Sequence, residues 1–259
     1  MTSLFAAAAR CLEASEPDDK LEASARAAAD WRAGVLDWRG ACDPPAPDVP
    51  AKPALPRLVP PSAVPRRRLG TPAGRIAFVH ALAHIELNAI GLAWDCVCRF
   101  RGLPRAFYDD WVAVADDEAR HFSTLRARLR DLGGEYGDLD AHDGLWEMAA
   151  KTAGDLAARL AMVPRVLEAR ALDVTPGMIE RLRAAGDEPT AAILAVILEE
   201  EVAHVAAGSR WFRWECRRRG QDPDTEFQAL VARYWRGPIR APVNVAYRRR
   251  AGFSDAELA

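Results

Sequence analysis

The chain carries one pattern twice: a lone glutamate, and 32 or 33 residues later a glutamate that is followed three residues on by a histidine. The six residues are Glu86, Glu118 and His121 in the first copy, and Glu168, Glu201 and His204 in the second. A glutamate on each of two helices and a Glu-x-x-His pair on each of two others can hold two metal ions inside a four-helix bundle. The pattern therefore predicts an all-α fold around a dinuclear metal site.

The helical neighbours of the predicted ligands are apolar. Apart from the paired histidines, the residues three or four positions from Glu118 and Glu201 are all apolar, so both carboxylates lie on a face that a helix buries. A buried ionised carboxylate costs several kcal/mol without a cation. Arg165 could pair with Glu168, but one arginine cannot neutralise four carboxylates, whereas two metal ions can. Carboxylate-rich sites with one imidazole per metal suit iron or manganese better than zinc or copper.

The first Glu-x-x-His pair lies in a longer motif. The stretch Asp117-Glu118-Ala119-Arg120-His121 resembles the Asp-Glu-x-Arg-His motif of di-iron oxygenases and ribonucleotide reductase small subunits. By this resemblance Asp117 orients a ligand histidine and Arg120 holds Asp117, a supporting role that metal sites commonly require. The second pair differs, because Glu200 stands where the aspartate would be and Ala203 replaces the arginine.

Proline divides the chain. Ten of its eighteen prolines fall between Pro44 and Pro72, which forbids regular helix and central strand there. Leucines and valines interleave with these prolines, which favours a strap laid across the bundle over a flexible linker. Thr2 or Ser3 is a candidate cap for the first helix. We expect three parts: a helical N-terminal extension over 1–42, a Pro-rich strap or linker over 43–72, and the bundle with an irregular C-terminal tail over 73–259.

Helical periodicity takes over after the strap. The four expected bundle helices cover roughly 74–100, 104–132, 145–172 with a kink at Pro164, and 189–219, and shorter helices are expected near 176–185 and 227–235. Short turns join the first helix to the second and the third to the fourth, so each pair should form an antiparallel hairpin. A longer connection joins the two hairpins. This is the ferritin-like topology.

The charge is nearly balanced, with a formal net charge of −2, so no global field attracts nucleic acid or an anionic membrane. Three local runs of arginine occur: Arg66–Arg68, Arg217–Arg219 and Arg248–Arg250. We interpret them as solvated helix ends or linkers. Nucleic acid is therefore not an expected partner.

The remaining composition indicates a soluble protein. Five scattered cysteines, Cys42 among them, give no framework for a secreted disulfide fold. The N-terminus lacks the pattern of a signal peptide, and no run of about 20 apolar residues is seen. We expect a cytoplasmic protein without a membrane partner.

Three histidines stand outside the repeated pattern. His80 and His84 lie one turn apart, on a side of their helix that points away from Glu86, and His142 lies in the connection between the hairpins. We interpret all three as packing or structural residues.

Several stretches from Pro65 onward are similar to one family. They are Leu69-Gly70-Thr71-Pro72, Ala83-His84-Ile85-Glu86-Leu87, Phe107-Tyr108-Asp109-Asp110-Trp111, Asp117-Glu118-Ala119-Arg120-His121-Phe122, His142-Asp143-Gly144-Leu145-Trp146, Pro164-Arg165-Val166-Leu167-Glu168-Ala169-Arg170 and Ala251-Gly252-Phe253. Together they resemble bacterial proteins grouped as domain-of-unknown-function family 455, in the ferritin-like di-iron carboxylate superfamily. The resemblance implies the fold and the ligands and names no substrate. A more distant similarity is to the ferritin-like tRNA hydroxylase.

The leading hypothesis is a non-haem di-iron or manganese–iron oxidoreductase that activates dioxygen and oxidises an organic substrate. A separate electron donor would supply its electrons. The expected roles are bridging carboxylates for Glu118 and Glu201, terminal carboxylates for Glu86 and Glu168, and one imidazole per metal from His121 and His204. A ferroxidase or iron-handling protein without an organic substrate is the alternative, and an enzyme like the tRNA hydroxylase is a further one. A purely structural bundle leaves the six ligands unexplained. A homodimer is one candidate assembly.

Overall fold

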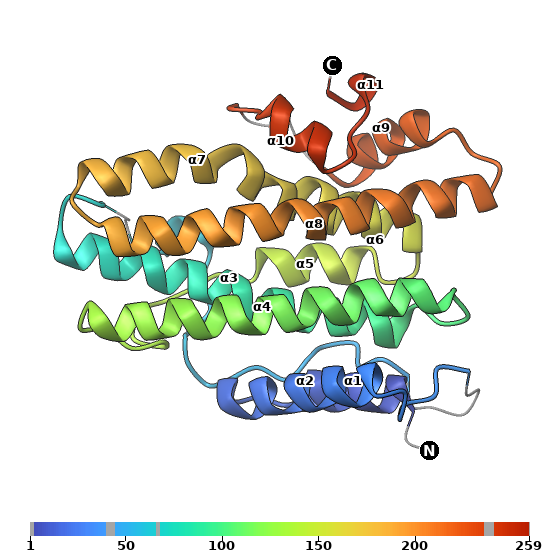
Figure 1. The fold of residues 1–259 in the computed structure, drawn as a ribbon, viewed down its shortest axis with the longest axis horizontal. Helices are drawn as coiled ribbons and strands as arrows, with labels where there is room; N and C mark the ends of the chain where they lie inside the picture. The colour runs from blue at the N-terminus through green and yellow to red at the C-terminus, as the bar shows by residue number, and fades with distance from the viewer. Residues whose placement is uncertain (1–2, 40–44, 66–67, 236–240, 259) are drawn as a thin grey trace. The chain divides into compact units, whose positions relative to one another are not determined.

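The computed structural model describes residues 3–39, 45–65, 68–235 and 241–258. Within these ranges the regular secondary structure is helical, which confirms the all-α prediction, and extended pairing is limited to isolated bridges (Figure 1). Two compact units are distinguished, Met1–Trp146 and Glu147–Ala259. This division does not coincide with the three parts expected from composition. Thr2, Cys42, Arg66 and Arg67 lie outside the described residues, so the expectations placed on them do not enter the description.

The first unit begins with two helices that contribute to its core. Helix α1 (Leu4–Glu13) starts at Ser3, whose hydroxyl accepts a hydrogen bond from the amide of Ala6 at 3.1 Å, so Ser3 is a cap as expected. Helix α2 (Pro17–Arg32) packs against α4, and α1 packs against α3. Most of α1 is buried, so the N-terminal segment belongs to the core of the first unit.

Helices α3 (Pro72–Arg99) and α4 (Arg105–Asp131) form the central hairpin of the first unit. Thr71 caps α3, and Pro72 occupies its first turn, where a missing N–H costs nothing. Gly133, with φ of +83°, follows the end of α4, as expected for a glycine in the left-handed region. Both helices agree with the expected ranges to within a few residues.

Helix α3 is buried along almost its whole length. Among the described residues it meets the length and composition of a membrane span, although no such run was expected from the sequence. However, most of its apolar stretch is buried inside the protein, and the core helix of a soluble protein meets the same criterion. The apolar composition of α3 is therefore explained by its place in the core.

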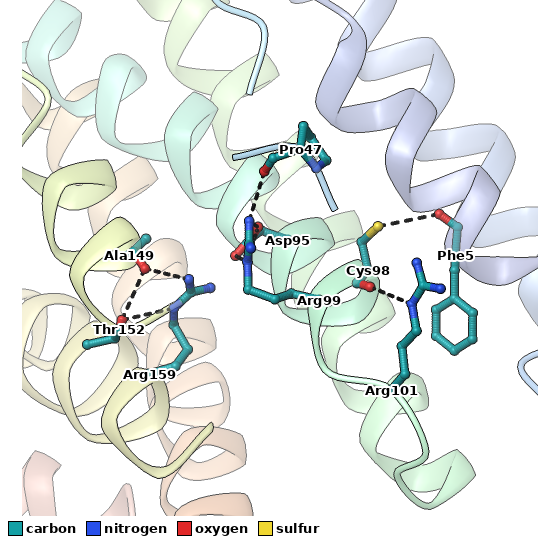
Figure 2. A network of polar contacts seen from close by, with 9 residues as sticks. All are labelled: Phe5, Pro47, Asp95, Cys98, Arg99, Arg101, Ala149, Thr152 and Arg159. Atoms are coloured by element: carbon teal, nitrogen blue, oxygen red, sulfur yellow. Dashed lines mark hydrogen bonds and ion pairs between the residues drawn. The ribbon is translucent and has the colours of Figure 1, made fainter. Parts of the chain in front are cut away.

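The described part of the Pro-rich segment is tied to the first unit by backbone hydrogen bonds. The amide of Ala51 donates to Leu12 at the end of α1 (2.9 Å), and residues 57 and 59 bond to Ala141 in both directions. The guanidinium of Arg99 pairs with the buried Asp95 on its own helix and donates to the carbonyl of Pro47 at 2.8 Å (Figure 2). These bonds hold the described part of the segment against the first unit, and its assignment as a strap stays a prediction.

The third expected helix is divided in the structure. Helix α5 (Gly144–Lys151) ends well before α6 (Leu156–Met162), and Arg159 holds this break by donating to Ala149 and Thr152 (Figure 2). The six residues Val163–Glu168 then form a π-helical segment, η2. Pro164 lies in it, and the expected kink at this proline thus appears as a widened turn, because proline lacks the amide that an α-helical bond would need.

The expectation of one helix over 145–172 and a separate short helix over 176–185 is therefore wrong. Helix α7 runs unbroken over Ala169–Ala184, with Pro176 inside it. It packs against α8 (Glu188–Arg218), which Asp187 caps and which the left-handed Gly220 follows. These helices form the central hairpin of the second unit.

The C-terminal tail is more regular than expected. Helix α9 (Pro223–Tyr234) confirms the expected short helix, and α10 (Val245–Arg250) and α11 (Asp255–Leu258) add two that were not expected. Both are shorter than two turns, so neither provides a periodic pattern long enough to recognise. Helix α11 contacts α9, and α10 contacts α7 and α8.

Gly208 permits the close approach of α8 to η2. A Cβ atom at this position would lie 2.6 Å from Cβ of Pro164, whose ring cannot move aside. We expect Gly208→Ala to lower the free energy of unfolding by about 1–3 kcal/mol through overpacking, measured by urea denaturation. Gly177→Ala, on α7 with open space around the new methyl group, is the control and should stabilise by up to about 1 kcal/mol. Equal stability of Gly208→Ala and the native chain would contradict the close contact.

Candidate metal centre

Three of the six predicted ligands meet inside the first unit. Helix α3 supplies Glu86, and α4 supplies Glu118 and His121 one turn apart. The Nδ1 atom of His121 lies 3.3 Å from Oε2 of Glu118 and 3.5 Å from Oε2 of Glu86. One ligand atom from each of the three lies within 4.8 Å of the others.

The three side chains are almost fully buried. Glu118 and His121 are each 1% exposed and Glu86 is 5% exposed. The spacing explains this arrangement, because residues three apart on α4 share a face and that face packs against α3. Two carboxylates and an imidazole that are buried and lie this close together could hold a metal ion.

His121 shows how strongly the site favours a positive charge. Burial by itself would lower the pKa of His121, but hydrogen bonds to Glu118 and Glu86 and their negative charges outweigh it and raise that pKa to about 11. A protonated imidazole thus places one positive charge between two carboxylates. A divalent cation would satisfy the same demand while His121 binds it in the neutral form.

The second unit carries the second Glu-x-x-His pair. Glu201 and His204 lie one turn apart on α8 and are 5% and 2% exposed. The Nδ1 atom of His204 lies 3.7 Å from Oε1 of Glu201. The spacing therefore gives the same local arrangement as on α4, with a carboxylate and an imidazole side by side on a buried face.

Glu168 is the last residue of η2 and is partly buried. π-Helical turns within longer helices occur often at functional sites, because they turn a side chain out of the α-helical register. That Glu168 joins Glu201 and His204 stays a prediction. The suggested pair of Arg165 with Glu168 is wrong, because Arg165 pairs with Glu257 at 2.6 Å instead.

The supporting residues are placed in part. Arg120 donates to Asp117 at 2.6 Å on the exposed side of α4, as the motif resemblance implies. The orienting contact from Asp117 to a ligand histidine stays a prediction. Glu200, assigned to the same supporting role on α8, is partly exposed, and its role likewise stays a prediction.

The other histidines make contacts with protein groups. His80 accepts from the amide of Gly137 at 3.0 Å and stacks on Tyr136. His84 bonds to the hydroxyl of Tyr136 at 2.9 Å, and burial lowers the pKa of His84 to about 4. Both therefore anchor the segment after α4, in keeping with the packing roles inferred for them.

Two groups of charged residues were missed by sequence reasoning. Lys20 and Lys52 line a pocket of the first unit, and Arg165 lies in an aromatic enclosure of the second. Composition offers a signal for the first group, because the chain has three lysines among its 35 basic residues and two of them are here. The partner of Arg165 lies 92 residues further along the chain, so no local pattern indicates it.

Comparisons with known proteins identify a relative and a family for this chain. An uncharacterized protein of Haemophilus influenzae is 42% identical over 218 residues, which cover 82% of this chain and 76% of the relative. No solved structure matches the chain at a significant level. The family described as protein of unknown function (DUF455) matches residues 13–259, and the chain belongs to that family.

Proposed function

We propose that this chain is a non-haem di-iron or manganese–iron carboxylate protein that activates dioxygen and oxidises an organic substrate. The observation that carries the proposal is the buried group of Glu86, Glu118 and His121. The second Glu-x-x-His pair and Glu168, at matching spacing, would complete a ferritin-like ligand set of two histidines and four carboxylates.

The donor atoms fit iron or manganese. Carboxylates and imidazoles without a thiolate suit these ions, and two divalent ions would balance the four carboxylates. None of the ligands is a cysteine, and the free cysteines of the described residues are buried elsewhere. When bound, such ions would supply the electrons that reduce dioxygen.

The surrounding residues have separate tasks in this proposal. The apolar side chains around the α3 and α4 ligands, such as Ile90 and Phe122, exclude water and so limit the loss of reactive oxygen species. His121 sheds its proton when a cation binds, which makes metal affinity fall as the pH is lowered. Asp117 and Arg120 pair with each other on the exposed side of α4.

Ion pairs count against the alternative of an RNA-modifying enzyme. In the run Arg248–Arg250 each arginine has its own carboxylate partner. Arg218 and Arg219 likewise pair with Glu215. An arginine already neutralised by a carboxylate contributes little to phosphate binding, so these runs favour a small-molecule substrate.

Iron loading under anaerobic conditions tests the proposal. We expect about two ions per chain, and oxygen should then be consumed in a fixed ratio to bound iron. Failure of the purified protein to take up iron or manganese would exclude the proposal. If free iron(II) is turned over continuously, the ferroxidase alternative is supported instead, since an oxidoreductase without its substrate should stop after the bound ions are oxidised.

A further inference from the structure

Lysine is rare in this chain, and its positions are informative. The sequence has three lysines, Lys20, Lys52 and Lys151, against 32 arginines. Lys151 is exposed on α5, whereas Lys20 and Lys52 line one pocket of the first unit. Lysine presents a compact charge, whereas the broad guanidinium of arginine needs more room, so lysine is the basic residue that suits a small pocket.

The pocket lies beneath the Pro-rich strap. Its walls come from the strap (Pro50–Pro53, Pro56 and Leu58), from α3 (His84, Leu87, Asn88 and Gly91), and from Tyr136, Asp143 and Trp146 after α4. The cavity volume is about 30 Å³, enough for more than one water molecule. Any ligand must therefore be small, with only a few heavy atoms.

Lys20 brings an uncompensated charge to this pocket. It is 4% exposed, and its ammonium makes one hydrogen bond, to the carbonyl of Cys11 at 2.7 Å. Within the described part of the chain it has no carboxylate partner, and burial lowers its pKa to about 8. A buried ammonium without a counter-ion is costly, and an anion in the adjoining space would relieve that cost.

Asp143 provides the complementary feature. One of its oxygens pairs with the ammonium of Lys52. The other, Oδ1, is buried and accepts no hydrogen bond from the protein residues that the structure describes. A ligand that carries a hydroxyl or an ammonium could donate to this oxygen.

We propose that the pocket binds a small carboxylate whose other end donates a hydrogen bond, a 2-hydroxy or 2-amino acid of two or three carbons. The carboxylate would bind Lys20, the donor would bind Asp143, and the short carbon chain would contact Leu87 and Trp146. A phosphate brings nearly two negative charges, more than the single uncompensated ammonium neutralises. The small size of the pocket and the single charge of Lys20 therefore favour a carboxylate over a phosphate.

This site is separate from the candidate metal centre. On α3 the pocket residues His84, Leu87, Asn88 and Gly91 share one face at helical spacing. Glu86 points to the other side of the helix, because two residues along an α-helix correspond to about 200° of rotation. The inference therefore does not rest on the proposed oxidoreductase function.

Lysine labelling tests the proposal directly. Protein grown with lysine carrying ¹³C at Cε should give three NMR signals, which Lys52→Arg and Lys151→Arg assign by elimination. We expect glycolate or glycine, titrated at constant ionic strength, to shift the Lys20 signal with saturation at a midpoint on the order of 1 mM, a modest affinity for so small a ligand. The exposed Lys151 signal is the internal control and should not move.

Two variants complete the test. In Lys20→Met the midpoint, followed at the Lys52 signal, should rise at least about tenfold because a charge-assisted hydrogen bond is lost. Acetate, which has no donor, should bind more weakly than glycolate in the native chain. A Lys20 signal that does not move, or that follows Lys151, would overturn the site. Equal binding of acetate and glycolate would overturn the role of Asp143, and tighter binding of inorganic phosphate would overturn the carboxylate class.

Discussion

Replacing Glu118 by alanine is expected to lower the metal content of the protein at least about tenfold, while the helices remain folded. Glu118 is 1% exposed and lies 3.3 Å from His121, so in the proposed site it would contribute a ligand atom and also orient the imidazole. Loss of a residue that merely supports a ligand already costs 10–100-fold in metal affinity, and loss of a ligand should cost no less. Elemental analysis of protein dialysed against iron gives the ratio, and circular dichroism gives the helix content.

Asp116→Ala is the matched control for this experiment. Asp116 lies two residues away on α4, and it pairs on the surface with Arg32. It should keep the metal content of the native chain, because an exposed ion pair contributes about 0–1 kcal/mol and no ligand is lost. Unchanged metal content in Glu118→Ala would mean that the buried group on α3 and α4 is not the metal site.

The second large effect is expected at Arg165, through stability. Its side chain is fully buried, and its guanidinium lies over the rings of Phe212, Phe227 and Phe253 at 4.4–4.7 Å. Its ion-pair partner Glu257 also has a fully buried side chain. We expect Arg165→Met to lower the free energy of unfolding by about 3–5 kcal/mol, because the buried carboxylate of Glu257 loses its nearest cation and keeps only the more distant Arg213, at 3.7 Å.

Two further variants separate the causes of this loss. Arg249→Met removes an exposed pair with Asp255 and should cost about 1 kcal/mol or less. Arg165→Met combined with Glu257→Leu should recover at least about 2 kcal/mol, since an apolar pair can replace a buried ion pair at little cost. Chemical denaturation measures all three. Similar losses in Arg165→Met and Arg249→Met would show that the enclosure does not hold a strong pair.

Sequence patterns predicted the helices that are determined by local capping residues and by an amphipathic face. Helices α3, α4 and α8 follow from capping residues, terminal glycines and long apolar faces, and the Glu-x-x-His spacing placed Glu118 beside His121. The closeness of Glu86 to His121 also followed, because a short turn brings α4 back alongside α3. These parts depend on rules that act within a few residues.

Contacts between distant segments were not predictable in the same way. The π-helical turn η2 depends on Pro164 and on its packing against Gly208, 44 residues later. The pair of Arg165 with Glu257 depends on α11, which is too short to show a period. The pocket at Lys20 depends on where the strap crosses α3, and proline composition does not determine such a crossing. In each case tertiary packing, and not local preference, decides the outcome.

The burial of α3 has a consequence for mutational tolerance. One side of this helix carries Glu86, and the other carries the pocket residues around Asn88. Glycine at position 91 is fixed as well, because a methyl group there would lie 2.9 Å from the ring of Trp146. A core helix usually has one face on which residues can be substituted, but few positions between residues 77 and 98 of α3 reach solvent. Attempts to redesign or label this protein should therefore begin on α2 or α9 and leave α3 unchanged.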